Sequence, residues 1–114
     1  MRAELINLLA ALKANTTSFA KVIEFIETYY QHTPTAFTNG DAYNEANQNQ
    51  GSAKVFAFAQ LNELSEADTL MLFAEHYQAV LASPDAADHQ NIRQFLLHGW
   101  SGIAFEGEAL SAKV

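Results

Sequence analysis

Six neutral amide side chains lie within twelve consecutive residues of the chain. They are Asn39, Asn44, Asn47, Gln48, Asn49 and Gln50. Such side chains carry both hydrogen-bond donors and acceptors, and their burial avoids the desolvation cost of a charge. Two interpretations stay open. The amides can satisfy the backbone groups of their own loop, or they can line a pocket for an uncharged polar ligand or a peptide backbone.

A second polar motif, HQNIR at residues 89–93, is far away in sequence and could face the amide-rich stretch. Gln90, Asn91 and Arg93 would then meet it across a shared surface. Together the two motifs and their neighbours give the candidate ligand-binding residues. These are Asn39, Asn44, Asn47, Asn49, Gln50, Lys54, His89, Asn91, Arg93, Trp100 and Glu106.

The histidines do not have metal-site spacing. His32, His76, His89 and His98 form neither an HxxxH nor an HExxH motif, so the pattern predicts no metal. His89 follows Asp88, which is a candidate helix cap, and this favours capping or core hydrogen bonding.

The segment Gly51-Ser52-Ala53-Lys54 invites two functional interpretations besides a plain helix start. Ser52 as a nucleophile would need the strand-turn-helix context of GxSxG, which this segment lacks. Backbone N–H groups at a helix start could instead cradle an anion, with Lys54 nearby. The spacing of a phosphate-binding loop is absent. We expect Ser52 to be an N-cap and predict no catalytic residue.

Carboxylates could also meet across the chain. If the segments around Asn39 and Glu106 pair, Asp41 or Glu45 would approach Glu106. Two close carboxylates would suit hydrolysis or a hard cation. A solvated acidic rim is the simpler interpretation.

These residues are positioned by elements with helical periodicity. Apolar side chains at spacings of 3 and 4 predict helices at 2–14, 17–31, 66–82 and 89–98. Residues 33–52 are expected to be non-helical, because Pro34 ends the second helix and Asn39-Gly40 is a turn dipeptide. The segment after Ser52 has features of both a strand and a helix, and its residue propensities favour a helix.

The predicted fold is mostly α, with about five helices in a single domain spanning 1–114. Residues 35–39 and 102–106 share an aromatic residue followed by glycine. They could pair as a short two-stranded β element.

Composition limits the function. The chain has 13 acidic and 6 basic residues, a net charge of −7, and no cysteine. Scattered basic residues argue against nucleic acid and anionic membranes as partners, and the missing cysteines exclude disulfides and thiolate metal sites. The N-terminus lacks the pattern of a signal peptide, and no segment has the length of a membrane span. No cofactor is predicted.

Several long strings resemble the HopJ family, which is named for a type III secretion effector of plant-pathogenic bacteria. They include TPTAFTNGD, NEANQNQGSAKVFAFAQL and DHQNIRQFLLHGWSGIAFEGEAL, and the resemblance runs from Leu9 to Leu110. It implies export into a host cell. The early amphipathic helix is unlike an effector leader, and a bacterial cytoplasmic location stays equally open. The family often has a cysteine where this chain has Ala53.

Three functions follow as hypotheses. The first is a non-enzymatic, effector-type binding module, whose partner is a protein or small polar ligand. The second is a small cytosolic ligand-binding protein or hydrolase-like enzyme with Asp41, His89, Arg93 and Glu106 around a polar pocket. The third is an interaction protein that dimerises through an exposed aromatic patch. The sequence leaves the oligomeric state open.

Overall fold

The computed structural model describes residues 1–113, which contain six α-helices, one 3-10 helix and five short strands. The helices are α1 (Arg2–Lys13), α2 (Phe19–Tyr29), α3 (Gln50–Leu61), α4 (Glu66–Met71), α5 (Glu75–Ala82), α6 (Gln90–His98) and the 3-10 helix η1 (Gly99–Gly102). The strands are β1 (Tyr30–His32), β2 (Phe37–Asn39), β3 (Ala42–Asn44), β4 (Ile103–Phe105) and β5 (Leu110–Ala112). The mostly α prediction is confirmed. Within the described chain, no helix has both the length and the apolar character needed to cross a bilayer.

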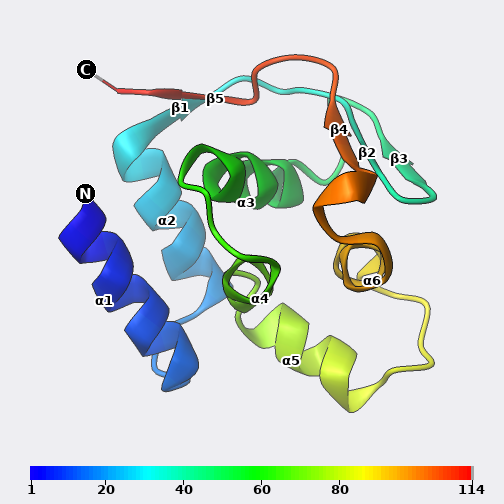
Figure 1. The fold of residues 1–114 in the computed structure, drawn as a ribbon, viewed down its shortest axis with the longest axis horizontal. Coiled ribbons are helices and arrows are strands. Elements are labelled where there is room, and N and C mark those ends of the chain that lie inside the picture. Colours follow the sequence, from blue (N-terminus) through cyan, green and yellow to red (C-terminus); the bar gives the residue numbers. More distant parts are fainter. Residues whose placement is uncertain (114) are drawn as a thin grey trace.

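Helix α3 lies at the centre of the molecule, between α2 on one side and α6 on the other (Figure 1). Its residues Val55, Phe56 and Phe58 have no exposed surface. Consecutive residues of a helix point in different directions, so α3 is buried on several faces and must be surrounded by other elements. This decides the ambiguity of the segment in favour of a helix.

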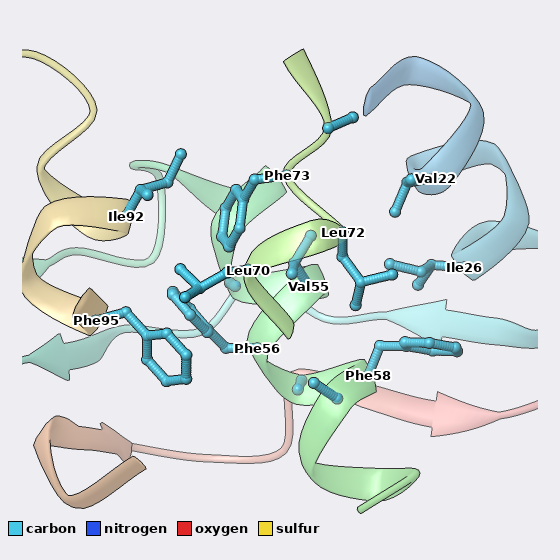
Figure 2. Close-up of a cluster of buried hydrophobic side chains, with 14 of the residues drawn as sticks. Val22, Ile26, Val55, Phe56, Phe58, Leu70, Leu72, Phe73, Ile92 and Phe95 are labelled. Carbon is cyan, nitrogen blue, oxygen red and sulfur yellow. The ribbon is translucent and has the colours of Figure 1, made fainter. Parts of the chain in front are cut away.

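Phe56 is the aromatic centre of the core. Its ring centroid lies 5.0 Å from that of Phe95, 5.4 Å from Phe73 and 6.1 Å from Phe37. Figure 2 shows Phe56 between side chains from α6 and the α4–α5 segment. One side chain of α3 therefore joins residues from three distant parts of the chain.

The single helix predicted at 66–82 is wrong, because two helices occupy this range. Leu70, Leu72, Phe73 and Ala74 are all buried, and side chains in such a run cannot share one face of a helix. The chain turns at Ala74, which has a φ of 51° and a ψ of −123°. The predicted N-cap at Ser65 is confirmed, since its Oγ accepts a hydrogen bond from Asp68 N at 3.0 Å.

The fold also contains two small antiparallel sheets. In the first, β2 lies between β3 and β4. The predicted pairing is confirmed, with Phe37 opposite Phe105 and Asn39 opposite Ile103. The turn between β2 and β3 is made by Gly40, whose φ is 58°. Part of the amide-rich stretch is therefore a strand, and Asn39-Gly40 is a hairpin turn.

The second sheet was not predicted. Tyr30 in β1 lies opposite Ala112 in β5, so the second helix ends at Tyr29 and does not extend to residue 31. The backbone groups of residues 30–32 pair with β5 because the chain has already left the helical conformation at Tyr30, whose φ is −134°.

Candidate functional site

Three buried asparagines connect the β2–β3 hairpin to α6. Asn39 Nδ2 donates hydrogen bonds to Asn91 O at 2.8 Å and Asn91 Oδ1 at 3.0 Å. Asn44 Nδ2 donates to Asn91 Oδ1 at 3.2 Å, and Asn91 Nδ2 donates back to Asn44 Oδ1 at 2.9 Å. None of the three side chains is more than 7% exposed. Because each bond joins segments far apart in sequence, the cluster fixes the hairpin on α6.

Asn49 extends this cluster toward solvent. Its Nδ2 donates to Asn44 Oδ1 at 2.7 Å, so this oxygen accepts two hydrogen bonds. At the other end, Asn39 Oδ1 is buried without a hydrogen-bond partner within residues 1–113. Asn39 Nδ2 faces two acceptors, which fixes the orientation of the amide.

Gln50 organises the loop that precedes α3. Its Nε2 donates to Gln48 O at 2.8 Å, Thr35 O at 3.2 Å and Glu45 O at 3.4 Å. Its Oε1 accepts from Thr35 N at 3.0 Å and pairs with His32 Nε2 at 3.1 Å. Since Gln50 Oε1 can only accept, His32 Nε2 carries the proton. Gln50 therefore serves the loop backbone, as the first interpretation of the amides expects.

Burial lowers the pKa of His32 below its usual value. The hydrogen bond with Gln50 raises the pKa in opposition, and the nearby charges of Lys54 and Glu27 have smaller effects of opposite sign. Desolvation disfavours the charged imidazolium and is the dominant cause. The His32 side chain is consequently suited to a neutral, structural role.

The helix start differs from the prediction. The N-cap of α3 is Asn49, with a φ of 51° and a ψ of 39°, and not Ser52, which lies inside the helix. The Asn49 side chain makes no cap hydrogen bond to the helix, because its amide is bonded to Asn44. His89 caps α6 in the same left-handed conformation, with a φ of 50°.

A cavity of about 500 Å³ adjoins the asparagine cluster. It lies where the N-terminal ends of α3 and α6 meet the β3 strand and the start of α5. Its lining residues are Phe19, Ala42, Tyr43, Asn44, Asn49, Gly51, Ser52, Phe73, His76, His89, Gln90, Asn91 and Ile92. This volume is in the range of small-molecule sites.

Asn44, Asn49, His89 and Asn91 were predicted from the sequence and line this cavity. Asn39 lies behind its wall, hydrogen-bonded to Asn91. The sequence interpretation therefore located the asparagine wall of the cavity.

Sequence reasoning missed other lining residues, notably Phe19, Phe73 and His76. The two phenylalanines have the helical spacing of core residues. The ring of His76 lies 4.8 Å from that of Phe19 and 5.1 Å from that of His89. The sequence offered one signal for His76, namely that it is a histidine.

Gln94 was also missed, although it holds the hairpin. Its Oε1 accepts from Asp41 N at 3.0 Å. Asn91 and Gln94 are three residues apart on α6 and so share a face. That spacing could have identified Gln94.

The charged candidates lie outside the cavity lining. Arg93 Nη2 bonds Asp88 Oδ1 at 2.7 Å and Nη1 bonds Pro84 O at 3.2 Å, so Arg93 braces the α5–α6 loop. Its hydrogen bond holds the pKa of Asp88 below the usual value. Lys54 Nζ forms an ion pair with Glu27 Oε2 at 2.8 Å. Lys54 is therefore directed to Glu27 and does not line the cavity.

Trp100, Glu106, Gln50 and Asn47 also lie outside the lining. Trp100 packs on Phe95 with ring centroids 5.0 Å apart, and Asn47 is exposed. Glu106 is near Tyr43, and its hydrogen bond, followed by burial, raises the pKa of the Tyr43 hydroxyl. The structure therefore does not gather Asp41, His89, Arg93 and Glu106 around one pocket.

The site offers hydrogen bonds more readily than metal ligation. Among residues 1–113, no three His, Asp or Glu side chains are grouped in a way that could hold a metal ion. The cavity instead presents amide, hydroxyl, imidazole and backbone groups beside aromatic rings. Such a mixture suits a small ligand with both polar and apolar parts.

Comparisons with known proteins agree with the resemblance. The sequence model of the HopJ type III effector protein family matches residues 5–110. The chain is similar to a protein of unknown function, VPA0580, whose crystal structure superposes with a TM-score of 0.87 at 46% identity. The similarity covers 94% of this chain and 92% of that one. No match was found among curated proteins.

Proposed function

The chain belongs to the HopJ type III effector protein family, and we propose that it is a non-enzymatic module that binds a small polar ligand. The binding site is the cavity between the N-terminal ends of α3 and α6. The single observation that carries this proposal is a cavity of about 500 Å³ lined by both distant polar motifs of the sequence.

The asparagine cluster supports binding by giving the cavity a prearranged wall. Asn44 and Asn91 line the cavity, and their amides are held by each other. Side chains held in one orientation lose little freedom when a ligand arrives, and this favours affinity. The wall carries no net charge, which suits a polar ligand.

A screen of small polar compounds against the ¹⁵N-labelled protein would test this function. We expect amide chemical-shift changes to concentrate at the cavity lining. Gly51→Leu should abolish them, because a Cβ at this position would lie 3.4 Å from Phe19 Cζ and a longer side chain would occupy the cavity.

Gly107→Leu is the matched control. A Cβ there would make an ordinary contact of 3.6 Å with Thr35, and Gly107 is not among the lining residues. Both variants should first be shown to unfold cooperatively. Binding that survives Gly51→Leu, or shift changes scattered over other surfaces, would refute the proposed site.

Transfer into a host cell is a second candidate function, supported by the family's description. We propose testing it with residues 1–18, which include α1, fused to a reporter enzyme. Reporter activity in host cells that depends on a working type III apparatus would support export. Equal signals with and without the apparatus would refute it for this segment.

The third hypothesis, an exposed aromatic patch, has weak support. The exposed large apolar side chains of residues 1–113 are mostly aliphatic, and Leu81, Leu96 and Leu97 border a groove between α5 and α6. Tyr43 is exposed, whereas most of the other aromatic rings pack in or against the core.

A further inference from the structure

The cavity is a place where the positive ends of two helices converge. Helix α3 has 12 residues and α6 has 9, and residues in the first turn of each line the cavity. A helix concentrates partial positive charge at its N-terminus, because the first N–H groups have no partner within the helix. The two ends reinforce each other here.

The cap residues leave these donors available. Neither Asn49 nor His89 makes a side-chain cap hydrogen bond. Within residues 1–113, the N–H groups of Gly51, Ser52, Gln90 and Asn91 donate no hydrogen bond to another residue. Gln90 is exposed, whereas Gly51 and Ser52 are half-buried and Asn91 is buried. Buried donors normally acquire a partner, and a bound acceptor would provide one.

Side chains add to the preference for an acceptor. His76 and His89 lie on the cavity wall with ring centroids 5.1 Å apart. Each imidazole carries at least one N–H donor. The lining contains no Asp or Glu, although the chain has 13 acidic residues. An anion would therefore meet no carboxylate on the wall.

The nearest carboxylates in sequence already have hydrogen-bond or charged partners within the protein. Glu75 precedes His76, and its Oε1 accepts from Phe19 N at 2.8 Å. Asp88 precedes His89, and its Oδ1 pairs with Arg93 Nη2 at 2.7 Å. Asp88 Oδ2 also lies 3.9 Å from His89 Nε2, so each carboxylate contacts one lining residue although neither lines the cavity itself.

Apolar groups complete the cavity. Phe19, Phe73 and Ile92 are part of its lining, and Phe73 and Ile92 are almost fully buried. The half-buried Phe19 therefore offers most of the accessible area of the three. A free inorganic anion would leave its ring uncovered, whereas an organic acid can cover it. Burial of apolar area adds to affinity in proportion to the area covered.

We propose that the ligand is a small organic carboxylate with an apolar body. Its carboxylate accepts hydrogen bonds from the N-terminal N–H groups of α3 and α6, and its apolar body packs on Phe19. This inference rests on the proposed function and specifies the class of ligand that the same cavity takes.

A matched pair of probes isolates the effect of the ligand's negative charge on binding. Benzoate and benzamide have nearly the same shape, but benzoate alone is an anion. In ¹H–¹⁵N titrations up to about 10 mM, we expect benzoate to shift the amide signals of Gly51, Ser52, Gln90 and Asn91. It should bind at least about tenfold more tightly than benzamide, given the two helix ends. Inorganic phosphate should bind more weakly than benzoate.

His89→Asn tests the imidazole without disturbing the helix start, since asparagine tolerates the left-handed conformation. We expect benzoate affinity to fall several-fold. His98→Gln is the control, because His98 lies outside the lining, and it should leave the affinity unchanged.

The outcomes separate the class of ligand from the site. Equal binding of benzoate and benzamide at the cavity would overturn the carboxylate assignment and leave the proposed site intact. Tighter binding of phosphate than benzoate would replace the organic acid with an inorganic anion and overturn the assignment too. If benzoate shifts no cavity amide while other screened compounds do, the anion class is wrong. If no compound binds there, the proposed function also fails.

Discussion

Gln50 and Asn91 are both amide hubs, but they organise the chain over different distances. The partners of Gln50 lie between 2 and 18 residues away in sequence. Those of the Asn91 side chain lie 47 and 52 residues away. The same chemistry therefore shapes a loop in one place and joins two elements in the other.

The difference shows which amides matter for the cavity. Gln50 lies outside the lining, and its bonds hold residues 45–50 against Thr35. Asn91 is part of the cavity wall and fixes the hairpin that carries Ala42 and Tyr43. Asn91 is also more deeply buried than Gln50, so an unsatisfied group there should cost more free energy.

The largest effect should come from Asn91→Asp. An ionised carboxylate cannot donate to Asn44 Oδ1 as Asn91 Nδ2 does at 2.9 Å, and it would bury a charge. We expect the free energy of unfolding at pH 7 to fall by at least about 3 kcal/mol in urea titrations.

Acid should reduce this loss, because the protonated carboxyl can donate to Asn44 again. The loss should be smaller near pH 3, below the ordinary Asp pKa of about 3.9, than at pH 7. Asn47→Asp, at an exposed position, should change stability by less than about 0.5 kcal/mol. A loss at Asn91 that is independent of pH would contradict the charge argument.

Gln50→Ala should have an intermediate and local effect. It removes the acceptor of Thr35 N and the donor to Gln48 O. We expect a loss of about 1–3 kcal/mol, and faster hydrogen exchange at the Thr35 amide. Gln50→Glu keeps the acceptor and should slow that exchange relative to Gln50→Ala. Uniformly faster exchange across the chain would show that the hub is not local.

Double-mutant cycles should separate the two hubs. Asn44→Ala and Asn91→Ala share hydrogen bonds, so their coupling energy should be about 1 kcal/mol. Gln50→Ala and Asn91→Ala share no hydrogen bond in the described residues. Their effects should add within about 0.5 kcal/mol. Equal coupling in the two cycles would mean that the hubs form one network.

The smallest effect should be a pH dependence at His32. Burial lowers its pKa in the folded protein below the value of 6.5, so the unfolded chain binds more protons between the two values. The contribution of His32 to the free energy of unfolding is therefore fully present above pH 6.5. It is lost as the pH falls toward the pKa of His32 in the folded protein. His32→Gln should flatten this part of the stability curve, whereas His98→Gln should not. An unchanged slope in His32→Gln would exclude His32 as the source.

Regular patterns were predictable from the sequence where burial follows one face. Phe19, Val22 and Ile26 predicted α2, and the aromatic-glycine strings predicted the pairing of β2 with β4. The break at Ala74 was hidden, because a run of apolar residues fits a long helix until each must find its own packing partner. Tertiary packing decided the conformation there.

The candidate site was only partly predictable for a related reason. Asparagine was visible as a polar residue without charge, but Phe19 and Phe73 resemble ordinary core residues in sequence. Asn49 was not predicted as a cap, and neither Asn49 nor His89 was predicted to have a left-handed backbone, because N-caps usually have extended backbones. Conformation at these two residues depends on contacts between distant segments.

The buried position of Asn39 also affects how fast the protein is damaged by deamidation. An asparagine followed by glycine deamidates when the next backbone nitrogen attacks the side-chain carbonyl carbon and ammonia leaves. Water then opens the resulting succinimide to aspartate or isoaspartate. Here Asn39 is held by Asn91, and Gly40 N is bonded to Gly102 O at 3.0 Å, so both reacting groups are restrained. Folding should protect the side-chain amide of Asn39. Prolonged incubation in urea should therefore deamidate Asn39 faster than incubation in buffer, and peptide mass spectrometry would measure the difference. A molecule damaged while unfolded would then carry a carboxylate into the asparagine cluster, and its refolding would be impaired.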